Sequence, residues 1–296
     1  MAINFMQVII SGLLLGGIYA LISIGLTMIF GVVRIVNFAH GEFLMLAMYA
    51  TFWMFNLFQL DPYVAVFIVT PLLFLIGVLV QRVFIQPILN APATVKIFST
   101  LGLSIVLQNL ALMFWKADYR TVQTSYQTSV INLGTLVISY PRLVAFIVAT
   151  GINIALFFFF KRTYMGKAIR AVALDRGAAM LMGINVYNIY LLAFGLGTAF
   201  VGIAGALLMP IYYVFPTVGS LFILTAFVVV ILGGMGSVLG AFIGGLIIGL
   251  VEAFAGFYLD PALKEAVYFI IFILILVLKP TGLFGLGRGS EEVGMR

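Results

Sequence analysis

The chain contains no cysteine and a single histidine, His40, among its 296 residues. Without cysteine, a disulfide framework, a thiol nucleophile and a thiolate metal site are all excluded. One histidine cannot build a multi-histidine metal site, and no nucleophile–base pair can be assembled around it. We therefore expect no metal, no cofactor and no catalytic residue in this chain.

Charged residues are also scarce. They make up 8% of the chain, against about 25% in soluble domains, whereas hydrophobic residues make up 64% and the mean hydropathy is +1.26. So much apolar surface requires lipid as the solvent, where only helices or closed barrels satisfy the backbone. The apolar runs are long and lack the alternation of a barrel. The composition predicts an all-α, polytopic helical membrane protein with a single integral domain over residues 1–296.

The lengths of the apolar runs predict where the chain crosses the membrane. A helix needs about 20 apolar residues to span the hydrocarbon core. One run, 221–234, is shorter and ends at Gly233-Gly234, so it is either a short span or a half-helix. The runs that predict eight full spans are 6–31, 41–58, 63–81, 97–115, 143–160, 189–209, 240–258 and 264–279.

The distribution of lysine and arginine predicts the orientation, because these residues are enriched in cytoplasmic loops. If 161–188 is placed inside and the spans alternate, eleven of the fifteen Lys and Arg residues fall inside. That set includes the carboxy-terminal tail with Lys279, Arg288 and Arg296. The four that fall outside are Lys116, Arg120, Arg142 and Lys264. The pattern predicts an outside N-terminus, an inside C-terminus and an odd number of crossings.

The longest strongly polar stretch is the loop 161–188, which carries five of the Lys and Arg residues. Within it, Ala171–Met182 reads as an amphipathic helix, with Ala, Leu and Met on one side and Asp175 and Arg176 on another. Such a helix either docks on a cytoplasmic protein or lies on anionic lipid. The small residues Ala178 and Ala179 favour a protein partner. The net charge of +6 suits a lipid surface, and its scatter between apolar segments gives no indication of nucleic-acid binding.

Two apolar runs are interrupted by glycine and polar residues. Unwound backbone at membrane depth must line a cavity or be buried, so such breaks are candidates for a transport path. Each break is otherwise an ordinary turn. The hexapeptides FAHGEF (38–43) and TVGSLF (217–222) also hint at two related halves. The candidate path residues are Asn37, His40, Gly41 and Glu42 in the first break, and Gly233, Gly234 and Gly236 in the second.

Two acidic residues, Glu42 and Glu252, lie at or inside predicted spans. A charge at a helix centre costs about 3 kcal/mol on insertion scales, so these residues should face a cavity or a partner group. We expect Glu252 to pair with Lys264 or with a neighbouring subunit. His40 has no accompanying chain of acidic residues, which favours a structural hydrogen bond over a proton relay.

Four motifs together resemble one family, the branched-chain amino acid permeases of bacterial ABC importers. The first is GIYALISIGLTMIFGVVRIVNFAHGEF (17–43), and AVALDRGAAMLMGINV (171–186) is similar to the cytoplasmic coupling motif of that family. AFGLGTAFVGIAGALL (193–208) and AFVVVILGGMGSVLGAFIGGLIIG (226–249) resemble the segments that follow it. The resemblance covers most of the chain and is weakest in the outer loop 117–142.

The resemblance implies a bacterial inner-membrane permease that imports small polar solutes, above all branched-chain amino acids. Its partners would be a second homologous permease, two cytoplasmic ATP-binding subunits and an extracytoplasmic solute-binding protein. This chain has no GxxxxGK[ST] phosphate loop, since Gly166-Lys167 lacks the preceding glycine and is followed by Ala168. The residues expected to couple it to the ATPases are Asp175, Arg176, Ala178, Ala179, Met182, Gly183 and Ile184.

Other functions stay open at this point. Relatives in the family carry urea, short amides or aromatic acids. A stand-alone ion-coupled secondary transporter would need intramembrane relays of Asp, Glu or His, of which this chain has few. A channel would need a repeated filter motif, and none stands out.

Overall fold

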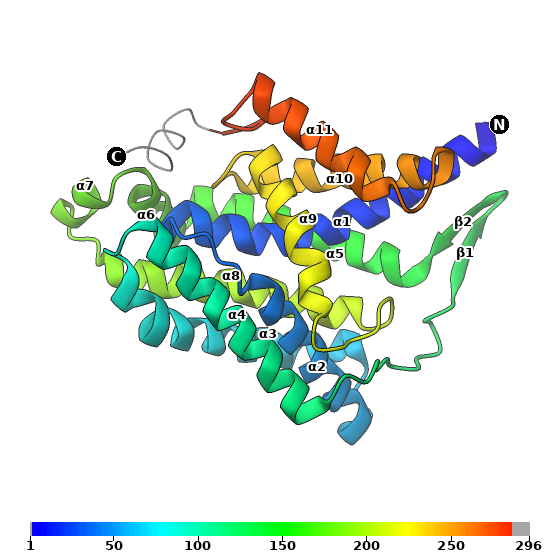
Figure 1. Ribbon diagram of the computed structural model, residues 1–296, viewed down its shortest axis with the longest axis horizontal. Helices are drawn as coiled ribbons and strands as arrows, with labels where there is room; N and C mark the ends of the chain where they lie inside the picture. The colour runs from blue at the N-terminus through cyan, green and yellow to red at the C-terminus, as the bar shows by residue number, and fades with distance from the viewer. Residues whose placement is uncertain (1, 286–296) are drawn as a thin grey trace.

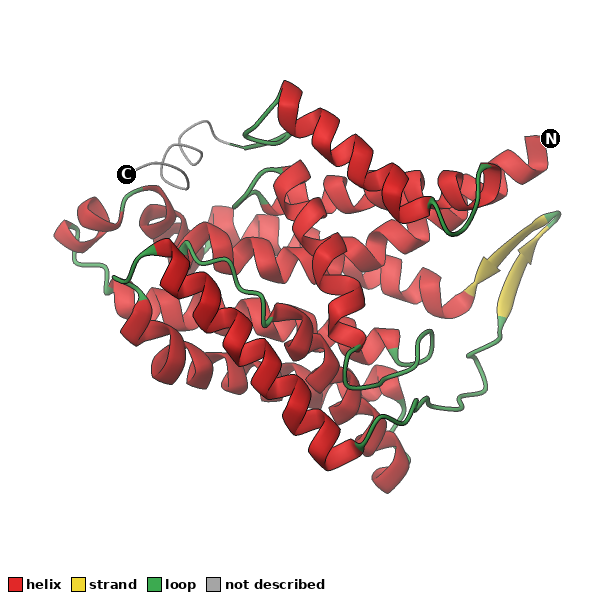
Figure 2. Cartoon of the chain, in the orientation of Figure 1, coloured by secondary structure: helices red, strands yellow, loops and turns green. Residues whose placement is uncertain are grey.

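The computed structural model describes residues 2–285, with side chains from Phe5 onward. Arg288 and Arg296, which the charge pattern places in an inside tail, lie outside the described residues. Figure 2 shows helix almost throughout, with one pair of short strands. The helices are α1 (Ala2–Val33), α2 (His40–Phe58), α3 (Pro62–Val80) with its extensions η1 (Gln81–Ile85) and η2 (Gln86–Ile88), α4 (Ala93–Trp115), α5 (Tyr140–Arg162), α6 (Tyr164–Leu174), α7 (Arg176–Leu181), α8 (Val186–Leu208), α9 (Val218–Gly233), α10 (Val238–Tyr258) and α11 (Lys264–Leu278).

Within residues 2–285, seven helices are long and apolar enough to cross a membrane, where the sequence predicts eight. The predicted span 264–279 forms α11, which has only 15 residues. At 1.5 Å per residue that helix is about 23 Å long, less than the ~30 Å hydrocarbon core. The short run 221–234 forms α9, which has 16 residues. The fold is therefore a polytopic helical bundle in which α9 and α11 are shorter than full spans.

The bundle is arranged around α1 and α8. In the most apolar 18-residue window of each helix, 83% of α1 and 78% of α8 is buried, against 17% of α4. α1 packs most extensively on α10, and α3 on α8. Glycine makes these contacts close: a side chain at Gly16 of α1 would meet the backbone of Gly245, and one at Gly249 of α10 would meet Gly16. Small residues at four-residue spacing let helix backbones approach closely in lipid.

The packing pattern repeats itself between two halves of the chain. Exchanging α1–α2–α3 with α8–α9–α10 preserves it, because α1 packs on α10 as α8 packs on α3, and α2 packs on α9. α1 and α8 run in opposite directions, since Gly25 faces Gly197 and Val201 while Gly197 faces Gly25 and Ile29. The two halves are therefore related as an inverted repeat, a common architecture of transporters.

The predicted outer loop 117–142 contains the only strands of the described chain. β1 (Val130–Leu133) pairs antiparallel with β2 (Leu136–Ser139), and the connecting turn places Gly134 at φ 64°. The all-α prediction missed this hairpin. Earlier in the loop, Tyr126 donates its O–H to both carboxylate oxygens of Asp61, at 2.9 and 2.8 Å, and burial raises the pKa of Tyr126 above its usual value.

The two ends of the molecule differ in character. In Figure 1 the N-terminal end of α1 lies near the hairpin β1–β2, and α6 and α7 lie at the opposite end. Long helices run between these two ends. The outer loop and the polar loop 161–188 are thus on opposite sides of the bundle.

Candidate functional site

The first predicted break, between α1 and α2, is an irregular segment buried inside the protein. Ile35, Asn37 and Ala39 are at most 1% exposed. Most of this segment is therefore packed inside the protein, although Arg34 at its start is exposed. Asn37 Oδ1 accepts a hydrogen bond from the backbone N–H of Ala39 at 3.1 Å, which shapes the turn that begins α2. Its Nδ2 is buried and has no hydrogen-bond partner within residues 2–285.

His40 is fully buried at the first position of α2. Its Nε2 lies 3.1 Å from the carbonyl oxygen of Ile22 in α1. A carbonyl can only accept, so Nε2 carries the proton and Nδ1 is an acceptor, which has no partner in the described chain. This geometry fits the expected structural histidine, because it joins α2 to α1.

Glu42 lies in the first turn of α2 and is 1% exposed. Its Oε1 accepts hydrogen bonds from Ser104 Oγ at 3.0 Å and Gln108 Nε2 at 2.7 Å, both from α4. Gln108 Nε2 also donates to Ser220 Oγ of α9 at 3.2 Å. We call Glu42, Ser104, Gln108 and Ser220 the Glu42 cluster. The other carboxylate oxygen, Oε2, is buried and has no hydrogen-bond partner among the residues that the structure describes.

The amino-terminal ends of α2 and α9 meet beside this cluster. A side chain added at Gly41 would meet the backbone of Gly219, and one added at Gly219 would meet the backbone of Gly41. Gly41 is the second residue of α2 and Gly219 the second residue of α9, so the structural repeat aligns them, whereas the two hexapeptides FAHGEF and TVGSLF place them one position apart. Helix amino termini carry partial positive charge, which favours the Glu42 carboxylate between them.

The second predicted break is a tight turn between α9 and α10. Gly234 and Gly236 adopt φ values of 101° and 89°, which favour glycine. Gly233 packs backbone to backbone on Gly240. This turn lies at the opposite end of α9 from Ser220, about 20 Å away along the helix. The two sets of predicted path residues therefore lie in two separate regions of the bundle and do not form one site.

The polar loop 161–188 folds into two short helices where the sequence predicts one over Ala171–Met182. The backbone of Asp175 is extended, with φ −149° and ψ 109°, which ends α6. Its Oδ1 then accepts the backbone N–H of Ala178 at 3.0 Å and caps α7. An N-capping aspartate both stops one helix and starts the next, so the predicted continuous helix was wrong.

The predicted coupling residues divide between the surface and the interior. Asp175, Arg176, Ala178, Met182 and Gly183 are exposed, whereas Ala179 is buried and Ile184 is half-buried. The exposed tip is apolar, because Leu181 is 90% and Met182 81% exposed. Sequence reasoning missed Leu181, since the run Ala-Ala-Met-Leu-Met does not say which side of a six-residue helix faces out. Gly183 follows the helix at φ 79°, in the left-handed conformation that favours glycine.

A cavity of about 480 Å³ lies behind this tip, next to the end of α1. Three cationic residues line it, Arg34, Lys96 and Arg176, together with Asp175. The Arg34 guanidinium also donates to the carbonyl of Ala173 at 3.2 Å, which ties α1 to α6. The polar loop is thereby in direct contact with the residue that follows α1.

Apolar spanning helices, an inverted repeat with buried breaks and a capped polar loop define a multi-pass helical membrane permease. Residues 8–276 match the family described as "Branched-chain amino acid transport system / permease component", and the chain belongs to this family. The family predicted from the four motifs is thereby confirmed.

Curated relatives match along nearly the whole chain. The high-affinity branched-chain amino acid transport system permease protein BraD of Pseudomonas aeruginosa is 33% identical over 298 residues, covering 95% of this chain and 96% of its own. LivH of Escherichia coli K12, named in the same way, is 33% identical over 294 residues, with the same coverage. A probable branched-chain amino acid transport permease protein LivH of Methanocaldococcus jannaschii is 28% identical over 280 residues, covering 90% of this chain and 88% of its own. No solved structure was found to match the chain.

Proposed function

We propose that this permease moves branched-chain amino acids inward across the bacterial inner membrane as one subunit of an ABC importer. The observation that carries the proposal is the match to branched-chain amino acid permeases over 95% of the chain. Its relatives are permeases and not ATPases, and the sequence has no phosphate loop. Energy must therefore come from partner subunits.

The partners follow from the same reasoning. They are a second homologous permease, two cytoplasmic ATP-binding subunits, an extracytoplasmic solute-binding protein and the surrounding lipid. The exposed apolar tip Leu181–Met182 supports a protein partner for the polar loop. Apolar side chains that protrude into water commonly mark a surface that another protein covers. Asp175, Arg176, Ala178 and Gly183 form the rim of this docking surface, and the inward-packed Ala179 and Ile184 support it.

The chain is a single integral permease domain with its N-terminus outside and the polar loop inside. The Lys and Arg asymmetry supports this orientation. The separation of the hairpin from α6 and α7 in Figure 1 agrees with it. The path runs past the first break, with Asn37, His40, Gly41 and Glu42 at its wall. The turn with Gly233, Gly234 and Gly236 is the second candidate wall of the path, at the far end of α9.

Reconstitution of the complete importer in proteoliposomes tests this function. Labelled leucine should accumulate only when ATP and the binding protein are both present. Uptake of labelled urea or a phenyl acid, with none of leucine, would contradict the cargo. Accumulation by this chain alone, driven by an ion gradient, would contradict the importer and favour a secondary transporter.

A further inference from the structure

The Glu42 cluster has spare hydrogen-bonding capacity in the interior of the membrane domain. A carboxylate has about four lone-pair sites on two oxygens. Here Ser104 and Gln108 both donate to Oε1, and Oε2 is buried with no partner in the described part of the chain. A buried, half-satisfied carboxylate is unfavourable unless another cationic or polar group completes it during function.

The cluster lies at the depth where a transported solute must pass. Ser104 is the central residue of α4, which runs from Ala93 to Trp115. Gln108 lies one turn further along, about 6 Å from that centre. The amino termini of α2 and α9 meet at the same place, between the two halves of the inverted repeat. Transporters with inverted repeats bind their cargo at such midplane helix ends.

The outer side of the cluster faces out of the single chain. Ser220 is exposed, Gln108 is half-buried and the neighbouring Asn109 is exposed, all in the spanning region. Polar side chains at this depth rarely face lipid. This side therefore meets the second permease or the aqueous path between the two permeases. Gln108 bridges Glu42 and Ser220, so it separates the carboxylate from that path.

We propose that Glu42 binds the ammonium group of an α-amino acid as it crosses the membrane, with Gln108 moving aside to admit it. This inference rests on the proposed function and specifies its cargo as a solute that carries an ammonium group. Oε2 accepts one ammonium N–H, and Ser104 keeps the carboxylate in place through Oε1. A neutral cargo such as urea would make no ion pair here.

The experiment uses the complete importer in proteoliposomes with leucine-loaded binding protein. Glu42→Gln keeps the size of the side chain and removes its charge. Leucine uptake by this variant should fall by about tenfold or more, the scale of one lost charge-assisted hydrogen bond. Glu265→Gln makes the same chemical change at an exposed position of α11 and should leave uptake unchanged. Parental uptake by Glu42→Gln would overturn the proposal.

A second measurement decides the matter even if Glu42→Gln fails to assemble. Ser220→Cys introduces the only cysteine of this chain, beside the cluster. Leucine turnover should slow the reaction of this cysteine with a small thiol reagent several-fold. The labelling is measured on this chain after it has been separated from its partners. Ser125→Cys, in the outer loop, should show no such protection. Equal reaction with and without leucine, in a complex that transports leucine, would overturn the ammonium site and leave the importer function standing. A parental complex that takes up no amino acid would instead refute the function.

Discussion

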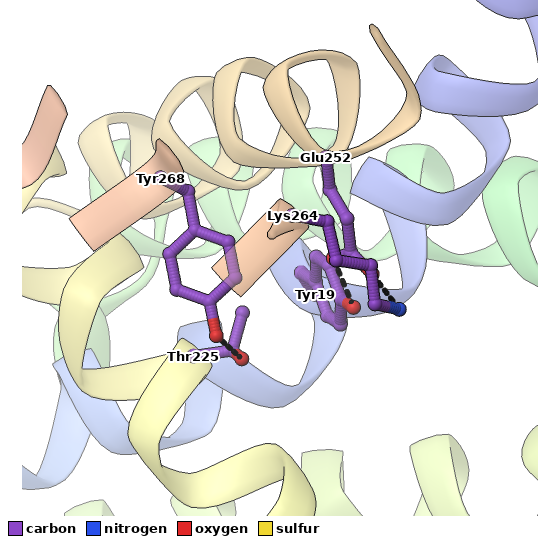
Figure 3. Close-up of polar contacts among 5 residues, drawn as sticks. All are labelled: Tyr19, Thr225, Glu252, Lys264 and Tyr268. Carbon is purple, nitrogen blue, oxygen red and sulfur yellow. Dashed lines mark hydrogen bonds and ion pairs between the residues drawn. The ribbon is translucent and has the colours of Figure 1, made fainter. Parts of the chain in front are cut away.

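Tyr19, Glu252 and Lys264 show how one buried charge is accommodated in this bundle (Figure 3). The Glu252 carboxylate accepts the Tyr19 O–H at 2.6 Å through Oε2 and the Lys264 ammonium at 2.7 Å through Oε1. Both oxygens are therefore satisfied, in contrast to Glu42. The contact joins α1, α10 and the first residue of α11, and it confirms the predicted pairing of Glu252 with Lys264.

Removing only one partner of the Glu252–Lys264 pair should lower the free energy of unfolding more than removing both charges does. Lys264→Met leaves the Glu252 carboxylate buried without its cation. We expect a loss of about 2 kcal/mol, below the 3–5 kcal/mol of fully buried pairs because the Lys264 side chain is 40% exposed. Adding Glu252→Gln to Lys264→Met should recover part of it. Thermal unfolding of the purified chain in detergent measures both. A double variant less stable than Lys264→Met would contradict a purely electrostatic cause.

The residue scale also shows what a sequence can and cannot predict. Glu252 and Lys264 are 12 positions apart on consecutive apolar runs, so their pairing follows from the order of the spans. Glu42 bonds to Gln108 across 66 positions, and Gln108 in turn bonds to Ser220 across 112. Those contacts depend on how α2, α4 and α9 pack, which no local pattern specifies. Hydropathy therefore predicts that Glu42 needs partners but does not identify them.

At the scale of elements, contact between α2 and α9 depends on glycine at one point. A Cβ at Gly41 or Gly219 would meet the backbone of the other residue, which cannot move aside as a flexible side chain can. Gly102 of α4 offers a matched control, because nothing lies within 4 Å of a Cβ added there.

Gly41→Ala and Gly219→Ala should each destabilise the protein by about 1–3 kcal/mol, the usual cost of overpacking. Gly102→Ala should be neutral or slightly stabilising, since alanine favours helix by up to about 1 kcal/mol. Midpoints of thermal unfolding in detergent compare the three. Similar midpoints in all of them would mean that α2 and α9 do not touch at these glycines.

The polar loop was predicted in position and polarity, but its shape was not. Amphipathic periodicity extends through Asp175, and only the capping geometry ends the helix there. The chain thus turns a capped corner at Asp175, and α7 beyond it ends in the exposed side chains of Leu181 and Met182.

Leu181→Asp should uncouple this tip from the ATPases. Burying a leucine side chain is worth about 1.5–3 kcal/mol, which corresponds to a loss of ten- to a hundredfold in docking. ATP hydrolysis stimulated by the cargo-loaded binding protein should fall accordingly, with membrane insertion unchanged. Tyr164→Asp, also exposed but at the start of α6, is the control. Equal stimulation of ATP hydrolysis in both variants would place the docking surface elsewhere. Asp175→Arg would then test whether the ATPases contact the corner at Asp175 in place of the tip.

At the scale of the whole molecule, hydropathy predicted six of the eight full spans to within a few residues, and the exceptions are instructive. Over 63–81 the structure has a longer unit, because η1 and η2 extend α3 to Ile88. Over 264–279 the predicted bounds hold, since α11 runs from Lys264 to Leu278, but its 15 residues are too few to cross the membrane fully. The inverted repeat is barely visible in the sequence. Its two halves make equivalent helix–helix contacts but have few identical residues at equivalent positions.

The orientation of the bundle follows from charge and can be tested on the whole protein. The native chain has no cysteine, so single cysteines at Ser125 in the outer loop and at Lys167 in α6 report without interference. Both residues are exposed. The eleven inside Lys and Arg residues favour a cytoplasmic 161–188, and Figure 1 places that loop opposite the hairpin. A membrane-impermeant thiol reagent added to intact bacteria should label Ser125→Cys and spare Lys167→Cys until the cells are permeabilised. The reverse labelling pattern would mean that the chain has the opposite orientation in the membrane. The apolar tip Leu181–Met182 would then lie outside, where it could not contact a cytoplasmic ATPase.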